Sequence, residues 1–238
     1  MSLQTTENGA VRAVFEDLGG YSAVAQQRGA ELDAGAEGPL LGQLQRTNIQ
    51  LAAIPVFSLK GLAETTVNDL LVAANVSRRT FYKYFSNKMD VFESIYQMAV
   101  SLLMARFAAM QPQADSQQQW LRDMIALFFD YHLAVGPIIR LMQEEAMRGD
   151  SPLAVHRQQA HVLMQRLLVE RVDGGSTQRD PLTYRALIWA LEATSLELLG
   201  RQAKRGEIEQ AKQVMSDLLI SVLCPLIASP TIPSPDLA

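Results

Sequence analysis

The sequence predicts an all-α protein with an N-terminal helix-turn-helix domain of three helices and a C-terminal helical domain. Between residues 65 and 88, two short segments with clear helix starts lie on either side of a tight turn. The chain after residue 88 consists of one helix-forming segment after another, separated by prolines and glycines. No segment of the 238 residues alternates apolar and polar side chains with the period of a β-strand.

The first of the two short helices is predicted to start at Thr66. Its hydroxyl can accept a hydrogen bond from a free backbone N–H of the first turn, and Asp69 completes a pair that resembles a capping box. The apolar residues of 67–74 recur at i, i+3, i+4 and i+7, which places them on one face. Asn75 is the expected turn residue, because asparagine tolerates the left-handed conformation in which helices often end.

Ser77 is the expected N-cap of the second helix. Val76 and Phe81 then occupy the two positions that form a hydrophobic staple, which fixes the angle at which the helix leaves the turn. Phe81 and Phe85 lie four residues apart and can pack on the first helix. The opposite side of this helix presents a cationic and aromatic set, Arg78, Arg79, Tyr82 and Lys83.

The positive charge is local to this region. Residues 60–88 contain five Lys or Arg and two acids, which gives +3 in a chain whose net charge is −4. Arginine can bond two acceptors on the edge of guanine in the major groove, while ammonium and hydroxyl groups suit phosphate oxygens. The second helix therefore predicts a DNA-reading surface, for which a merely solvated helix face is the alternative.

The same residues resemble the DNA-binding domain of the TetR family of bacterial transcriptional repressors. In that family, a glycine and a Thr-Thr pair precede a serine-led recognition helix that ends in Tyr-x-x-Phe and a Ser-Lys or similar pair. The positions that match in type and spacing are Gly61, Thr65, Thr66, Ser77, Thr80, Tyr82, Phe85 and Lys88. The surface and the resemblance together imply DNA contacts by Thr66, Ser77, Arg78, Arg79, Thr80, Tyr82, Lys83, Tyr84 and Lys88.

Three residues depart from the family's pattern. Arg79 and Asn75 stand where the family commonly has glycine, and we expect Arg79 to alter base preference. Pro55 lies inside the expected first helix, roughly residues 44–59. It is expected to kink or shorten that helix, because proline lacks a backbone N–H.

Residues 1–44 have no counterpart in the family's usual domain. They hold two basic residues against six acids, so this acidic N-terminal extension cannot be a basic arm that grips phosphates. The apolar spacing between residues 11 and 18 suits a short amphipathic helix, and residues 33–39 suit a flexible linker. A loosely ordered tail and a helix docked on its own or the partner subunit are the two alternatives.

We expect the helix-turn-helix domain at 45–89, a helical ligand-binding and dimerisation domain at 90–228 and a flexible tail at 229–238. The expected helices of the second domain span 90–110, 116–135, 137–147, 152–172, 181–200 and 207–223. The last two carry apolar residues on several faces, which predicts a homodimer with a four-helix interface across a two-fold axis. Two symmetry-related recognition helices would then reach successive major grooves, about 34–36 Å apart, of a near-palindromic operator.

The resemblance implies that the second domain binds a small-molecule effector. Its middle helices combine aromatic, methionine and a few polar residues, a mixture that suits a largely apolar ligand fixed by one or two polar contacts. For each of these residues taken alone, a place in the core is the alternative and the more common role. The candidates are Phe128, Tyr131, His132, Met142, Met164, Trp189 and Glu192.

The sequence does not favour an enzyme. His156 and His161 are five residues apart and do not share a helix face as a zinc-binding i, i+4 pair would, and no Gly-rich phosphate loop or cysteine cluster occurs. No metal or cofactor is therefore expected. The single Cys224 excludes an intrachain disulfide and is typical of a core thiol, with a redox switch between subunits as the alternative.

No apolar run reaches the roughly 18 to 20 residues of a membrane helix, and the N-terminus lacks a signal-peptide pattern, so we expect a cytoplasmic protein. Our interpretation is a ligand-responsive, homodimeric regulator of transcription that acts as a repressor on double-stranded DNA. The alternative is a helical protein-interaction module with a vestigial helix-turn-helix, which would bind a protein through its acidic extension and apolar C-terminal helices.

Overall fold

The computed structural model describes residues 39–110, 116–175 and 179–224, and these residues form helices and their connections without any strand. The all-α fold class is thereby confirmed. The helices are α3 (Pro39–Glu64), α4 (Val67–Ala74), α5 (Arg78–Tyr84), α6 (Lys88–Ala109), α7 (Gln117–Val135), α8 (Pro137–Ala146), α9 (Leu153–Val172), α10 (Pro181–Gly200) and α11 (Arg205–Leu223).

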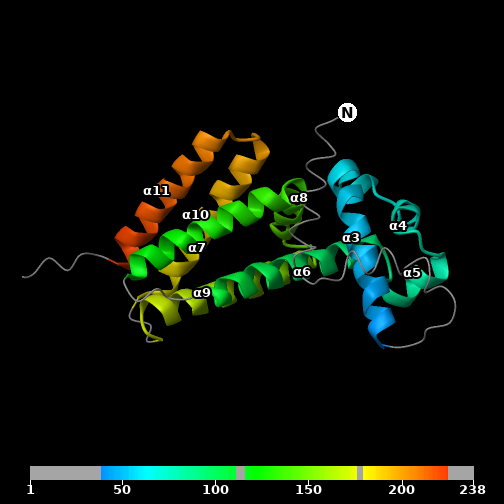
Figure 1. Cartoon of the computed structure of the whole chain (residues 1–238), viewed down its shortest axis with the longest axis horizontal. Helices are drawn as coiled ribbons and strands as arrows, with labels where there is room; N and C mark the ends of the chain where they lie inside the picture. Colours follow the sequence, from blue (N-terminus) through cyan, green and yellow to red (C-terminus); the bar gives the residue numbers. More distant parts are fainter. Residues whose placement is uncertain (1–38, 111–115, 176–178, 225–238) are drawn as a thin grey trace, which may run out of the picture.

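Helices α3, α4 and α5 form a lobe at one end of the molecule, and α6 leads from it along the helices of the second part (Figure 1). Aromatic packing joins the lobe to α6, since the Phe57 ring of α3 and the Phe92 ring of α6 lie 5.0 Å apart at their centroids. Helix α3 contacts α6 and α8 as well as α4, so the lobe packs on the helices that follow it. This arrangement leaves α4 and α5 at the outer end of the molecule, with α5 farthest from α11 (Figure 1).

The local signals for the two short helices are confirmed. Thr66 and Asp69 form a capping box, and Asn75 ends α4 in the left-handed conformation with φ of 51°. The Ser77 hydroxyl accepts from the Thr80 backbone N–H at 3.0 Å. Phe81 is fully buried, and Val76 packs against the same core. The helices expected after residue 88 are also present, with bounds that differ by a few residues.

The first helix differs from the expectation. It begins at Pro39, so residues 39–44 belong to α3 and not to an extension, and it runs through Pro55 to Glu64. Pro55 does not end the helix, because Ile54 and Phe57 on the same turn are buried in the core and hold it in place. The interruption lies at Gly61, whose backbone is non-helical at φ 75° and ψ 169°. The helix expected near residues 11–18, the linker up to residue 38 and the tail at 229–238 lie outside the described residues.

Among the described residues, no single helix is long and apolar enough to cross a membrane. Helices α7 and α8 reach the length and apolar composition of a membrane-spanning segment only when taken together, and they are bent by 104° at their junction.

Gly61 has a backbone conformation that is essentially restricted to glycine. A Cβ at this position would meet no atom within 4 Å, so Gly61→Ala should lower the free energy of unfolding through backbone strain alone, by about 1–3 kcal/mol. Gly42 in α3 is the matched control, since its Cβ would make ordinary contact with the Tyr84 ring at 3.6–3.7 Å. Gly42→Ala should therefore raise the free energy of unfolding by about 0.5–1 kcal/mol. Chemical denaturation measures both, and equal effects would contradict the assignment of strain to Gly61.

Candidate nucleic-acid interface

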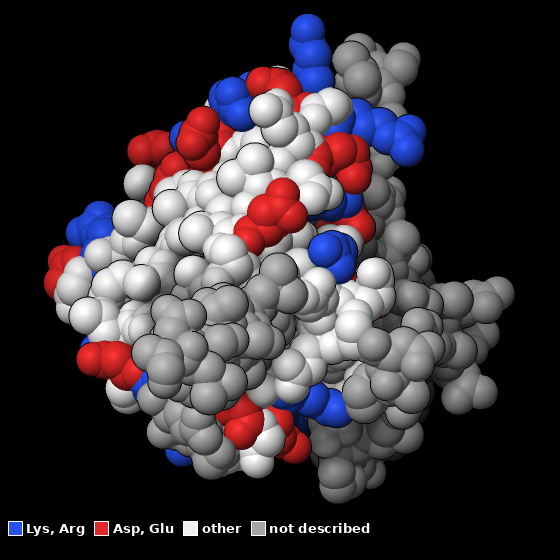
Figure 2. All heavy atoms as spheres, turned by 90° about the vertical axis from the view of Figure 1, so that its left-hand side faces the viewer, with Lys and Arg blue, Asp and Glu red and all other residues white. Residues whose placement is uncertain are grey.

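The outer face of α5 is cationic and open to solvent. Arg78, Arg79 and Lys83 are exposed, and none of the three forms an ion pair with another described residue. Tyr82 lies on the same face with half of its side chain exposed. Figure 2 views the opposite end of the molecule, where Lys and Arg lie interspersed with Asp and Glu. On α5, by contrast, three cationic side chains of one short helix lack an ion-pair partner among the described residues.

Buried aromatic residues hold this face in a fixed position. Phe81 and Phe85 pack into the core on the inner side of α5, with ring centroids 6.0 Å apart. The Arg46 guanidinium of α3 lies 5.3 Å from the Phe85 ring centroid. At the start of α5, the Ser77 and Thr80 hydroxyl oxygens are 2.8 Å apart, so both predicted contact residues lie at the N-terminus of the helix. Backbone N–H groups at a helix N-terminus favour a phosphate oxygen nearby.

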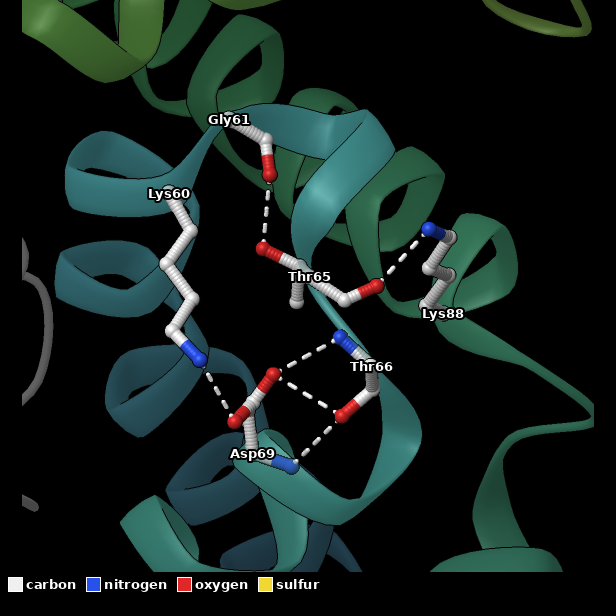
Figure 3. A network of polar contacts seen from close by, with 6 residues as sticks. All are labelled: Lys60, Gly61, Thr65, Thr66, Asp69 and Lys88. Carbon is white, nitrogen blue, oxygen red and sulfur yellow. Dashed lines mark hydrogen bonds and ion pairs between the residues drawn. The ribbon is translucent and has the colours of Figure 1, made fainter.

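A polar network fixes the turn that leads into α4 (Figure 3). The Asp69 carboxylate accepts from the Thr66 backbone N–H at 2.9 Å and from the Thr66 hydroxyl at 2.8 Å, and Lys60 donates to its other oxygen at 2.7 Å. The hydrogen bond from Lys60, followed by those from Thr66, lowers the pKa of Asp69 to about 2. The carboxylate therefore stays charged at neutral pH and holds the exposed N-terminus of α4 in place.

Lys88 connects this turn to α6. Its ammonium donates to the backbone oxygens of Ala63 and Thr65, both at 2.7 Å, while the buried Thr65 hydroxyl donates to the Gly61 oxygen at 2.7 Å (Figure 3). The carbonyls that end a helix lack intrahelical partners, so an ammonium there satisfies them. The first residue of α6 is thus bound to the last turn of α3.

Two predicted DNA-contact residues use their polar groups inside the protein. The Lys88 ammonium binds the α3 carbonyls, and the Tyr84 hydroxyl donates to the Gln45 side chain at 2.7 Å. Thr66, by contrast, is exposed beside its carboxylate partner, and Ser77 is exposed at the start of α5. The expected contacts of Lys88 and Tyr84 with DNA stay predictions, while their contacts within the domain give them a positioning role.

Lys88→Met should lower the free energy of unfolding by about 1.5–3 kcal/mol, because it removes two hydrogen bonds from a charged donor. The variant should also bind DNA more weakly. The slope of log affinity against log salt concentration should nevertheless stay the same as in the wild-type protein. Lys83→Met is the matched control: it should leave stability unchanged and reduce the slope by about two for the proposed dimer, since each of its two exposed Lys83 side chains is placed to neutralise one phosphate. Denaturation and DNA titration at several salt concentrations measure both effects. A reduced slope for Lys88→Met would identify Lys88 as a phosphate contact.

Sequence reasoning missed Lys60, Gln45 and Arg46 as supports of this surface. Each reaches a residue that lies nine or more positions away, Asp69, Tyr84 and Phe85 respectively. No spacing rule connects such pairs, since they meet only when α3 packs against α4 and α5. The basic character of residues 60–88 was the one available signal, and it did not distinguish structural from exposed charges.

Five of the candidate effector residues are buried in the second part of the chain: Phe128, Tyr131, His132, Met142 and Met164. The Tyr131 hydroxyl donates to the Ala99 oxygen of α6 at 2.9 Å, and His132 Nδ1 lies 2.7 Å from the Ser195 hydroxyl of α10. The Phe128 and His132 rings lie 4.0 Å apart at their centroids. Trp189 does not join them, because it lies on an outward face of α10 with 45% of its surface exposed.

Glu192 of α10 is the centre of an ion-pair network. Its carboxylate accepts from Arg157 at 2.6 and 3.1 Å and lies 2.7 Å from His161 Nε2, so it joins α9 to α10. Burial opposes ionisation of this carboxyl, but the hydrogen bonds from His161 and Arg157 outweigh it and lower its pKa. Burial also lowers the pKa of the nearby His132 to about 4, so this imidazole is neutral at pH 7. No group of three or more His, Cys, Asp or Glu side chains in the described ranges could hold a metal ion.

Comparison with known proteins agrees with these observations. The family profile "Bacterial regulatory proteins, tetR family" matches residues 49–95. The chain is similar to the HTH-type transcriptional regulator CymR of Pseudomonas putida, with 30% identity over 112 residues, 44% of this chain and 55% of CymR. It is also similar to the HTH-type transcriptional repressor NicS of Pseudomonas putida, with 25% identity over 100 residues, 42% of this chain and 47% of NicS. The matched segments thus span about half the length of these relatives.

The fold extends the similarity beyond the matched segment. The crystal structure of a tetR-family transcriptional regulator from Streptomyces coelicolor superimposes with a TM-score of 0.64 at 22% identity, over 76% of this chain and 82% of the other. The relatives in both comparisons are regulators of transcription and not enzymes. The capped helices and the family profile together show that residues 49–95 form a DNA-binding domain of the TetR type, and the described chain shares its fold with the Streptomyces coelicolor regulator.

Proposed function

We propose that the protein is a homodimeric repressor that binds a near-palindromic operator through α5 and leaves it when a small, largely apolar effector binds the second domain. The observation that carries this proposal is the unpaired cationic face of α5, held by two buried phenylalanines and a capped N-terminus. Repression rather than activation is supported by the relative NicS, which is named a transcriptional repressor. A cytoplasmic location is part of the same proposal.

The proposed dimer uses α10 and α11. Four large apolar side chains on these helices are exposed: Leu182, Trp189, Val214 and Leu218. A soluble protein gains free energy by covering such a surface, and a two-fold arrangement covers the same surface on both copies. Two copies related in this way would carry two α5 helices to one face of the DNA.

The proposed response to effector passes through α6. This helix starts at the Lys88 contact with α3 and continues into the second domain, where it packs against α7 and α9. A ligand that favours another position of α6 would move the two α5 helices relative to each other. A tenfold preference of the ligand for the released state contributes about 1.4 kcal/mol to dissociation.

Selection of bound sequences from random duplex DNA at two salt concentrations tests the proposal. An enriched near-palindrome, bound by a species of dimer mass in sedimentation, is the expected result. Absence of enrichment, with only weak and salt-sensitive binding, would favour the alternative of a protein-interaction module. Titration of small molecules into a preformed DNA complex then tests the response, which fails if molecules that bind the protein leave DNA affinity unchanged.

A further inference from the structure

The chain enters the described part of the molecule beside α5. Helix α3 begins at Pro39, and its Gln45 accepts from the Tyr84 hydroxyl at the C-terminal end of α5 at 2.7 Å. A Cβ on Gly42, three residues earlier, would lie 3.6 Å from the same hydroxyl. The first two turns of α3, blue in Figure 1, therefore pack against α5. The residues that precede Pro39 start close to the cationic face of α5.

These preceding residues are acidic. Within the acidic N-terminal extension, the segment 31–37 lies nearest to α3 in the sequence and contains no Lys or Arg. Its acids are Glu31, Asp33 and Glu37. The outer face of α5 carries the same number of positive charges, since its two arginines and its lysine are exposed and form no ion pair with a described residue. The two sets are complementary in sign and number, and only residue 38 separates the segment from α3.

The segment is long enough to cover the whole outer face of α5. An extended chain spans at most about 3.3–3.6 Å per residue, so the steps from Glu31 to Glu37 reach up to about 20 Å. The helix of 7 residues, α5, rises by only about 10 Å in total. The short connection to α3 also keeps the segment at a high local concentration, in the millimolar range for short linkers, so that contacts that are weak one by one are still occupied.

We propose that residues 31–37 lie over the outer face of α5 in the DNA-free protein, with their carboxylates paired to its two arginines and its lysine. DNA phosphates would bind the same cations, so the segment and DNA exclude each other and the contact is autoinhibitory. Exposed ion pairs are individually weak, so the segment lowers DNA affinity without preventing binding. The inference goes beyond the proposed function, because it gives α5 a partner within its own chain, and it rests on that function only for the effect on DNA.

A full-length variant that replaces the three acids of the segment with amides tests the effect on DNA. Its substitutions are Glu31→Gln, Asp33→Asn and Glu37→Gln. Affinity for the selected operator should rise by about three- to tenfold at low salt, because the competing contact is lost. The gain should shrink as salt increases, because exposed ion pairs are screened. Unchanged affinity at low salt would overturn the inference.

The matched control removes the same charge from the part of the extension that is farther from α3 in the sequence. Its substitutions are Glu7→Gln, Glu16→Gln and Asp17→Asn. This variant should keep operator affinity within about twofold, because its segment 31–37 is intact and more distant charges are screened. Equal gains in the two variants would show that the extension repels DNA through its total charge and would overturn the contact with α5.

Disulfide trapping tests the contact in the absence of DNA. Cys224→Ser removes the native thiol, and a pair of cysteines is introduced by Ala36→Cys in the segment and Tyr82→Cys on the outer face of α5. Mild oxidation should join this pair within one chain about tenfold faster than the pair Ala36→Cys and Glu170→Cys. Glu170 is the control position because it is exposed in the last turn of α9, at the other end of the molecule (Figure 1). Equal rates for the two pairs, or a disulfide formed only between two chains, would overturn the contact.

The inference and the proposed function fail separately. Selection of an operator by a protein whose amide variant gains no affinity overturns the contact and leaves the DNA-binding proposal intact. Fast trapping within one chain, in a protein that selects no DNA sequence, supports the contact and contradicts the proposed binding of an operator.

Discussion

Replacing Arg78 and Arg79 together with alanine should weaken binding to the selected operator by about 100-fold or more. Each arginine that donates to a guanine edge is worth about 1–3 kcal/mol of discrimination, and neither has an intramolecular ion pair to lose. Both side chains are exposed, so the free energy of unfolding should change by less than about 0.5 kcal/mol. Titration of labelled operator DNA at fixed salt measures the loss, and sedimentation checks that the dimer persists.

The control removes the same charge from elsewhere. Arg148, which pairs with Asp150 at 3.3 Å, and Arg166 are also exposed, and they lie before and within α9, away from the helix-turn-helix lobe. Arg148→Ala with Arg166→Ala should leave operator affinity within about twofold, because long-range charge effects are weak beyond the Debye length of roughly 8–10 Å. Equal losses in the two double variants would mean that net charge drives binding and would favour the vestigial helix-turn-helix.

Local sequence signals were sufficient for the helix-turn-helix. Thr66, Asn75 and Ser77 act on groups within four residues of themselves, so their caps follow from spacing alone. The amphipathic pattern and the punctuating prolines likewise located the later helices to within a few residues. The surface of α5 then follows. Burial of Phe81 and Phe85 on the inner side leaves the other side of this short helix exposed, with the set Arg78, Arg79, Tyr82 and Lys83.

Packing between distant segments was not predictable in this way. Pro55 looked like a helix breaker, yet the burial of Ile54 and Phe57 carries α3 through it. The DNA contact expected of Lys88 stays a prediction, while no pattern in the sequence indicated that its ammonium binds backbone oxygens more than twenty residues earlier. In both cases, the deciding interaction joins residues that the sequence keeps apart.

The effector site shows the same limit more strongly. Composition selects Tyr131, whose buried hydroxyl donates to the Ala99 oxygen of α6, a contact that no spacing within the sequence reveals. Trp189 was selected for its type and lies on the outward face of α10. Aromatic content therefore indicates a core or a pocket without distinguishing between them.

His132 should make the stability of the second domain fall as pH drops from about 6.5 to about 4. Burial lowers the pKa of His132 from 6.5 to about 4, while the Glu192 charge opposes this shift only in part. The unfolded chain therefore binds a proton below pH 6.5 that the folded protein does not bind until about pH 4. The contribution of neutral His132 to the free energy of unfolding is fully present above pH 6.5. Linkage predicts that about 3 kcal/mol of it is lost by pH 4.

His132→Asn isolates this contribution, because asparagine can keep a hydrogen bond to Ser195 and does not titrate. Other carboxylates and the remaining histidines titrate in the same range in both proteins, so the difference between the two pH profiles of unfolding free energy belongs to His132. The wild-type protein should lose about 3 kcal/mol more than the variant between pH 7 and pH 4. Parallel profiles would mean that His132 accepts a proton in the folded state near pH 6.5.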